Sequence, residues 1–256
     1  MGDIGGFMYL KVMNFLVLGL KRSGYAVSKL LLEKGAKVYL YDDKLTDVSN
    51  NNVCKLISLG ATLVENPNSI LDSIDVLVLS PAVAIDNPIC VTAKEMGIRI
   101  IGEFELASYF VTSPIVAGTG TNGKTTVCSI ISHVLQKAGY DNALLGNIGA
   151  PLSQEVNNLG ENTICVLEVS SYQLETTARF CPHIACVLNI SPDHLSRHYN
   201  MENYTYLKSK IVQIFIFTHR LCVSSQQKMH FCLPTKVRFL NDVCLRGHRG
   251  KHRIIA

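Results

Sequence analysis

The sequence predicts an α/β protein with two mostly parallel sheets, one in each of two domains. Three observations lead to this fold class. Apolar runs with the composition of buried strands alternate with segments of helical periodicity. This pattern restarts after Ser113-Pro114, and in each half a glycine-rich turn follows the first strand. The 256 residues, 48% of them hydrophobic, are enough for two ordinary domains.

The first domain opens with a predicted strand, a tight turn and a helix. Asn14–Leu18 is a short apolar run and Gly19–Gly24 is the turn. Tyr25–Glu33 has apolar residues at helical spacing before a stop signal at Gly35. Further strands are expected at Lys37–Tyr41, Ile74–Leu79 and Arg99–Ile101. This order predicts a Rossmann-like domain over residues 1–112.

The turn of this domain departs from the dinucleotide-binding pattern. Lys21 stands where G-x-G-x-x-G has its middle glycine, which argues against close approach of a dinucleotide pyrophosphate to the backbone. Asp42, at the end of the second strand, could accept hydrogen bonds from a nucleotide ribose or base. The alternative interpretation is a strand–helix–strand unit without a ligand.

The second domain repeats this order from Ile115. A strand is predicted at Ile115–Ala117, and a helix at Thr125–Ala138. The apolar face of that helix is Val127, Ile130, Ile131, Val134, Leu135 and Ala138. Strands at Thr163–Leu167 and His183–Leu188 follow, and each runs into polar residues at its C-terminal end. Ligands of open α/β sheets bind at this edge, so a site is expected there.

The segment Gly118–Thr125 matches G-x-x-x-x-G-K-[ST] and lies between a predicted strand and a predicted helix. Its glycines let backbone N–H groups turn toward an anion, and the helix adds its positive N-terminal end. Lys124 supplies a charge for the outer phosphates and Thr125 a hydroxyl for Mg²⁺. A chance glycine turn is the alternative, but the flanking elements favour a triphosphate site.

Four further polar residues lie near predicted strand ends or in a turn. Glu168 ends an apolar strand, where its carboxylate could reach a metal ion held at the phosphate loop. An ordinary surface acid is the alternative for Glu168. Asp193-His194 follows another strand and could contact metal or substrate, or form a capped loop. Asn147 lies in a glycine-flanked turn and by itself indicates only a turn.

Composition argues against several classes of protein. Nine cysteines without a CxxC pair favour neither a disulfide framework nor a zinc site, and they fit a reducing compartment. The apolar runs Phe15–Leu20 and Ile211–Phe217 are too short to span a bilayer. We therefore expect a cytoplasmic protein that makes no membrane contact.

Charge is distributed unevenly along the chain. Residues 214–256 hold eight of the 24 Lys and Arg residues and one of the 20 Asp and Glu residues. A basic tail can indicate nucleic-acid contact, but neither an aromatic platform nor a recognised module accompanies this one. We expect no nucleic-acid partner.

Several of these segments resemble the Mur ligases of peptidoglycan synthesis. Gly118–Thr126 looks like their ATP loop. Leu167–Glu175 is similar to the members that add D-glutamate to UDP-N-acetylmuramoyl-L-alanine. Ser80-Pro81, Asn147-Ile148-Gly149, Leu188–His198 and Met201–Tyr204 with Lys208 fit the same pattern in the same order. The resemblance covers about residues 12 to 213.

The resemblance implies a reaction and its participants. ATP with Mg²⁺ would phosphorylate the carboxylate of UDP-N-acetylmuramoyl-L-alanine, and the amine of D-glutamate would attack the acyl phosphate to form an amide. The protein would mainly position groups and neutralise charge. A monomer is expected.

By position, the resemblance also implies site residues. The nucleotide group is Gly118, Thr119, Gly120, Thr121, Asn122, Gly123, Lys124, Thr125 and Thr126. The substrate group is Arg22, Ser23, Asp42, Asp43, Ser80, Asn147 and His194. The metal group is Thr125, Glu168 and a carbamylated Lys208, and the catalytic group is Lys124, His194 and Lys208. Carbamylation needs a neutral amine, so the pKa of Lys208 would have to be depressed by burial or by neighbouring charge.

The chain also departs from the family pattern. Ser196 stands where the family often has Asp, and Ala82 replaces a glycine. The largest departure is that the likeness stops near Gln213, before the rest of the ATP domain and a third domain. We therefore expect a truncated P-loop ATP-binding domain over residues 113–213. Residues 214–256 would be an atypical basic tail, and our hypothesis is that they are read out of frame.

The sequence alone is compatible with two functions and disfavours two others. The first is a D-glutamate-adding ligase, impaired by truncation. The second is a non-catalytic fragment that binds the UDP-substrate, the nucleotide or both. A GTPase is disfavoured because no N-K-x-D segment is present, and an NAD dehydrogenase is disfavoured by Lys21 and by the second nucleotide loop.

Overall fold

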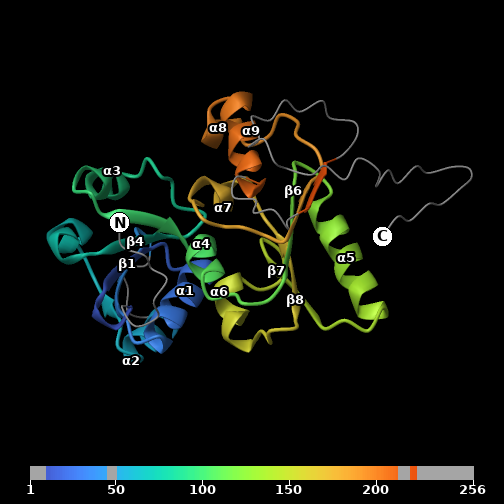
Figure 1. The fold of residues 1–256 in the computed structure, drawn as a ribbon. Coiled ribbons are helices and arrows are strands. Elements are labelled where there is room, and N and C mark those ends of the chain that lie inside the picture. Colours follow the sequence, from blue (N-terminus) through green and yellow to red (C-terminus); the bar gives the residue numbers. More distant parts are fainter. Residues whose placement is uncertain (1–9, 45–50, 213–219, 224–256) are drawn as a thin grey trace, which may run out of the picture.

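The computed structural model describes residues 10–44, 51–212 and 220–223, and these form two α/β domains (Figure 1). Each domain is built on a five-stranded sheet in which every pair of neighbouring strands is parallel. The predicted fold class is confirmed. None of the helices in the described residues is long and apolar enough to cross a membrane.

The N-terminal sheet has the strand order β3-β2-β1-β4-β5. Its strands are β1 Asn14–Leu18, β2 Lys37–Tyr41, β3 Thr62–Leu63, β4 Val76–Leu79 and β5 Arg99–Gly102. Its helices are η1 Leu10–Val12, α1 Arg22–Glu33, α2 Asn51–Ser58, η2 Pro67–Ser73, α3 Pro88–Glu95 and α4 Glu103–Ser108. Strands β1 and β2 have the predicted bounds, whereas α1 begins three residues before the predicted Tyr25.

Both faces of the N-terminal sheet are covered, as the alternation along β1 shows. Phe15 and Val17 pack with buried residues of α1, α2 and α4 on one face. Leu16 and Leu18 pack with buried residues of η2 and α3 on the other. Successive strand residues point to opposite faces, so a fully apolar strand requires cover on both sides. This explains why the four residues after Asn14 in this strand are all hydrophobic.

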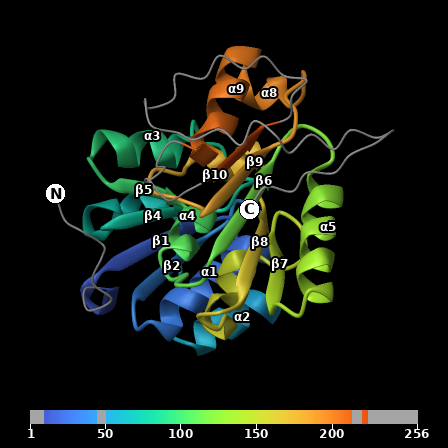
Figure 2. The ribbon, with the colours of Figure 1, turned by 45° about the vertical axis from the view of Figure 1, so that its right-hand side comes forward.

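The middle sheet has the strand order β10-β9-β6-β8-β7 (Figure 2). Its strands are β6 Ile115–Thr119, β7 Asn142–Gly146, β8 Ile164–Glu168, β9 Ile184–Val187 and β10 Arg220–Val223. Its helices are α5 Lys124–Lys137, α6 Leu152–Glu155, η3 Val156–Asn158, α7 Ser171–Glu175, α8 Leu195–His198, α9 Met201–Ser209 and η4 Lys210–Val212. Of the predicted tail, the structure describes only the backbone of β10, which pairs with β9.

The two faces of the middle sheet are covered unequally. One face packs against α4, α6, α7 and η4 around a buried apolar cluster that includes Phe104, Leu152 and Leu167. Helix α5 covers the other face (Figure 1), and its buried residue is Cys128. Ile130 and Val134 on the predicted apolar face of α5 are 55% and 58% exposed. The predicted helix is present, but much of that face is in contact with solvent.

Helix α4 joins the two domains. Its Leu106 belongs to the N-terminal core, while Phe104 and Ala107 belong to the middle-domain core. The buried carboxylate of Glu105 accepts hydrogen bonds from the backbone N–H groups of Arg179 and Phe180, at 2.6 and 3.0 Å. Because one helix contributes to both cores, the two domains are packed together rather than tethered.

Candidate active site

The phosphate turn links β6 to α5. Gly123 precedes α5 with φ 80°, a left-handed conformation that glycine adopts without a steric penalty. The turn is held from the end of β9, because Asn189 accepts hydrogen bonds from the N–H groups of Thr121 and Asn122. The ammonium of Lys124 folds over the turn and donates to the carbonyls of Gly120 and Thr121, at 2.9 and 2.8 Å. A cation and a helix N-terminus therefore face the same space, which suits a phosphate chain.

Glu168 ends β8 beside this turn. Its carboxylate is 2% exposed and accepts a hydrogen bond from Thr125 Oγ1 at 2.7 Å and another from Asn147 Nδ2 at 2.7 Å. Three of the predicted site residues, from β8, α5 and the β7–α6 loop, therefore meet at one point. Hydroxyl and carboxylate oxygens beside a phosphate turn fit Mg²⁺, which prefers oxygen ligands and completes its shell with phosphate oxygens and water.

Lys208 lies on α9 under the same turn. Its side chain is 1% exposed, and its ammonium donates to the carbonyl of Gly120 at 2.8 Å and lies 4.8 Å from the ring centre of Tyr204. Burial, and then the charge of Lys124, lowers the pKa of Lys208 to about 7. A large fraction of this amine is therefore neutral near neutral pH.

His194 lies on the more exposed side of the site. It precedes α8 with φ 53°, and its Nε2 lies 3.4 Å from Asp193 Oδ2. Its ring centre is 5.1 Å from that of Tyr172, the second residue of α7. The Asp193-His194 pair is therefore a surface pair beside α7, not a buried dyad.

Sequence reasoning did not single out His198 as a site residue. His198 is fully buried, its Nε2 lies 2.9 Å from Ser171 Oγ, and its Nδ1 has no hydrogen-bond partner among the described residues. Burial lowers the pKa of this imidazole, so the neutral form is favoured. Its burial comes from packing between α7 and α9, which no local sequence pattern indicates.

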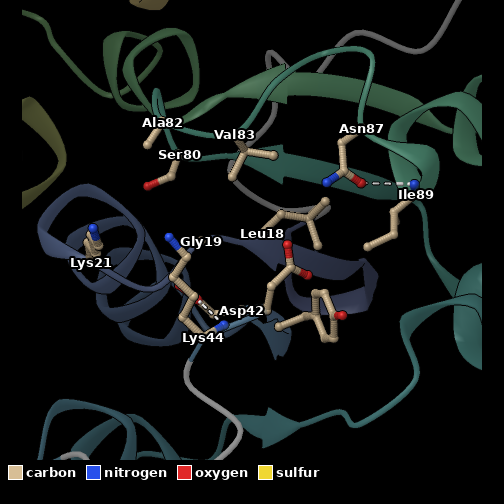
Figure 3. Close-up of a pocket in the computed structure, with 12 residues that line it drawn as sticks. Leu18, Gly19, Lys21, Asp42, Lys44, Ser80, Ala82, Val83, Asn87 and Ile89 are labelled. Atoms are coloured by element: carbon tan, nitrogen blue, oxygen red, sulfur yellow. Dashed lines mark hydrogen bonds between the residues drawn. The ribbon is translucent and has the colours of Figure 1, made fainter.

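The N-terminal domain contains a separate hollow of about 160 Å³ at the C-terminal ends of β1, β2 and β4. Figure 3 shows Ser80, Ala82 and Val83 along one side of it and Gly19 and Asp42 along the other. Asp42 Oδ2 accepts a hydrogen bond from the N–H of Leu20 at 2.7 Å, which fixes the glycine turn. Gly19 has φ 83°, and a Cβ there would lie 2.9 Å from both Ser80 and Val83.

Of the predicted substrate residues, four line two neighbouring hollows, while Asn147 and His194 lie at the middle-domain site. Asp42, Asp43 and Ser80 line the first. Arg22 lines a second hollow of about 470 Å³, together with Lys21, Lys44 and Gln154 of the middle domain. Ser23 lies beside Arg22 in the first turn of α1. The segment after β4 supplies further lining residues that the sequence did not single out: Val83, Asn87 and Ile89.

Fold and site together define a two-domain α/β protein whose second domain has a glycine-rich turn with the sequence pattern of a phosphate loop. Two domain families match the chain: the Mur ligase MurD-like N-terminal domain at residues 13–102 and the Mur ligase middle domain at residues 119–228. The chain belongs to the Mur ligase family. The match to the middle domain runs past Gln213, where our sequence reasoning placed the end of the likeness.

Relatives and solved structures agree with this family. A UDP-N-acetylmuramoylalanine--D-glutamate ligase of Caldicellulosiruptor bescii is 43% identical over 210 residues, which cover 80% of this chain and 46% of the relative. The corresponding protein of Pelotomaculum thermopropionicum is 44% identical over 199 residues, covering 77% and 44%. The crystal structure of UDP-N-acetylmuramate:L-alanyl-gamma-D-glutamyl-meso-diaminopimelate ligase from Neisseria meningitides has the same fold. Its TM-score is 0.55 at 17% identity, over 84% of this chain and 72% of that one. The chain spans about half the length of the curated relatives it matches.

Proposed function

We propose that the chain binds UDP-N-acetylmuramoyl-L-alanine in its N-terminal domain and Mg²⁺–ATP at the phosphate turn of its middle domain. The reaction that these sites serve is phosphorylation of the substrate carboxylate, followed by attack of the D-glutamate amine. The observation that carries this proposal is the meeting of Thr125, Asn147 and Glu168 at the phosphate turn. Relatives that match the chain along most of its length are named as ligases of this kind.

The predicted site residues would have different roles in this reaction. Lys124 would hold the outer phosphates, while Thr125 and Glu168 would hold Mg²⁺, which supplies charge neutralisation when bound. The remaining nucleotide residues, Gly118–Gly123 and Thr126, would surround the phosphates. Asn147 and His194 would contact the substrate end that reacts.

Lys208 has a separate role in this proposal. Its buried amine, with its pKa lowered to about 7, can take up CO₂ in its neutral form. The carbamate would turn a cation beneath the turn into an oxygen ligand for the metal site.

In the N-terminal domain, Asp42, Asp43 and Ser80 would hold the uridine end in the first hollow. Arg22 and Ser23, in the first turn of α1, would hold the diphosphate. The protein would act as a cytoplasmic monomer without nucleic-acid or membrane partners. Its N-terminal domain would be residues 1–112, and its middle domain would start at residue 113 and extend past residue 213 to include β10.

A second candidate function is binding without turnover. The observation that favours it is that the described residues contain two hollows and a phosphate turn, which are binding features in their own right. Release of phosphate from ATP, measured with both UDP-N-acetylmuramoyl-L-alanine and D-glutamate, separates the two candidates. Phosphate release that needs both substrates and is lost in Lys124→Ala supports the ligase. Calorimetric binding of the UDP-substrate without phosphate release supports the binding fragment, and failure to bind either ligand contradicts both.

A further inference from the structure

Helix α8 belongs to the middle domain, yet the side chains of Arg197 on this helix and of Tyr199 directly after it reach the N-terminal domain. Arg197 Nη2 donates a hydrogen bond to the carbonyl of Val83 at 2.9 Å. The hydroxyl of Tyr199 donates to Asp86 Oδ2 at 2.7 Å. Val83 lines the first hollow, and Asp86 lies in the same segment after β4, between Val83 and the lining residue Asn87. We call Arg197 and Tyr199 the α8 clasp.

The other side of the clasp reaches the middle-domain site. The same Nη2 of Arg197 donates to Glu175 Oε2 at 2.5 Å, and both side chains are largely shielded, at 17% and 11% exposure. Glu175 ends α7, the helix that begins three residues after Glu168. The guanidinium lies 5.6 Å from the ring centre of Tyr172, and that ring is 5.1 Å from the ring of His194. One nitrogen atom therefore joins the wall of the first hollow to the helix behind the phosphate site.

The backbone of the clasp is held in an uncommon conformation. Tyr199 has φ 67° and ψ −48°, and the N–H of Asn200 donates to the carbonyl of His198 at 2.8 Å. This is the rarer form of the γ-turn, which is strained for a residue with a side chain. Asn200 also caps α9 through its side chain, at 2.8 Å from the N–H of Asn203. The turn therefore fixes α8 relative to α9, the helix that carries Lys208.

We propose that Arg197, assisted by Tyr199, is a positioning residue that couples the UDP-substrate hollow to the ATP site. This inference rests on the proposed function, because it assigns a ligand to each of the two sites. A ligand that orders Val83 and its neighbours also orders Arg197, and with it Glu175, Tyr172 and the loop of His194. The second ligand then binds to a site that is already ordered, so each ligand strengthens binding of the other by the same factor.

The test is calorimetric titration of the full chain. The affinity for a non-hydrolysable Mg²⁺–ATP analogue is measured with and without saturating UDP-N-acetylmuramoyl-L-alanine, and then in the reverse order. We expect each ligand to tighten the other by about fivefold or more in the unchanged chain.

Two variants remove the clasp in different ways. The double change Arg197→Met with Glu175→Gln removes both charges, so that no shielded carboxylate is left unpaired. Tyr199→Phe removes one hydroxyl, and Tyr140→Phe is its control, because it makes the same change at an exposed site beyond α5. We expect both the double variant and Tyr199→Phe to lower the coupling factor. In the double variant the factor should fall to about one. Each separate affinity should change less than about threefold. Tyr140→Phe should leave the coupling unchanged.

The outcomes distinguish the clasp from simple interface packing. Packing alone would lower the melting temperature of the double variant and leave the coupling factor intact, which would overturn the inference. Binding of both ligands without coupling in the unchanged chain would also overturn it, while the proposed function stands. Failure of the unchanged chain to bind one ligand overturns both. If the double variant does not fold, Tyr199→Phe against Tyr140→Phe decides the question.

Discussion

Each domain begins with a strand, a glycine turn and a helix, but the two units use them differently. In the N-terminal unit, α1 has 12 residues and buries Gly24, Ala26, Val27, Ser28, Leu30 and Leu31. In the middle unit, α5 has 14 residues and buries Cys128. The turn before α5 leads directly into Lys124 and Thr125, the first two residues of that helix, which carry the chemistry of the site. The turn before α1 forms a hollow only with Asp42 and the segment after β4.

This difference separates two ways of building a ligand site. The phosphate turn has its backbone, its cation and its helix end consecutive in sequence, and Asn189 just after β9 and Glu168 of β8 hold it in place. The hollow at Gly19 depends on close packing of several strands, so its shape is a property of the N-terminal core. Changes in core packing should therefore affect the N-terminal unit most, and changes in single charged groups should affect the middle unit most.

The largest effect is expected from Leu31→Ala on α1. Leu31 is fully buried in the N-terminal core, and removing such a side chain costs about 2–5 kcal/mol of unfolding free energy. Urea unfolding followed by circular dichroism measures this loss. A change below about 1 kcal/mol would mean that the α1 face is not the tightly packed unit described here.

The next effect is expected from Lys124→Ala. Loss of the cation over the phosphate turn should weaken binding of a Mg²⁺–ATP analogue about a hundredfold, or about 2.7 kcal/mol, with little change in stability. Lys137→Ala, at the other end of α5, is the matched control and should bind as the unchanged chain does. Equal affinities for the two variants would show that the turn does not hold the phosphates.

A smaller effect is expected from Asp42→Ala. The N–H of Leu20 loses its acceptor and the glycine turn loses its anchor, so UDP-substrate affinity should fall about tenfold while ATP-analogue affinity stays unchanged. Asp75→Ala is a close control, because Asp75 accepts from the N–H of Asn14 at the opposite end of β1. Calorimetry on both variants tests the assignment, which is wrong if Asp75→Ala weakens UDP-substrate binding as much.

The smallest effect is expected from Val134→Ala on α5. Val134 is 58% exposed, so its truncation should change the unfolding free energy by less than about 0.5 kcal/mol. The same urea experiment as for Leu31→Ala makes the comparison direct. A loss close to that of Leu31→Ala would show that α5 is covered in solution.

Much of the fold could be predicted because its strands are short and uniformly apolar. β1 has its predicted bounds because a strand covered on both faces stands out against polar turns. β2 also has its predicted bounds, because its alternating Val and Leu are buried between exposed or half-buried neighbours. Strand β7 was not predicted from the sequence, because it lies at the edge of its sheet and all of its residues except Leu145 are only half-buried. The start of α3 was readable in principle, since Asn87 caps it and Pro88 opens it.

The site residues also fall into two groups, those that a local sequence pattern indicates and those that it does not. Lys124, Thr125 and Glu168 could be singled out because chemistry and local context coincide in the sequence. Val83 and His198 could not, because an ordinary valine and a lone histidine acquire their places only through packing between distant segments. The family resemblance supplied Lys208, whose surroundings depend on a contact with Gly120 that lies far away in sequence.

Gly102 lets the two domains approach closely, because a methyl group there would have little room. It ends β5 and faces the end of α7, where an added Cβ would lie 2.0 Å from Thr176 Oγ1 and 3.1 Å from Thr176 Cβ. Turning the threonine would relieve the first contact but not the second. Close packing at this point therefore leaves no room for an added methyl group between β5 and the end of α7. A larger residue at position 102 would act as a wedge, changing the distance between the first hollow and the phosphate turn without touching either of them.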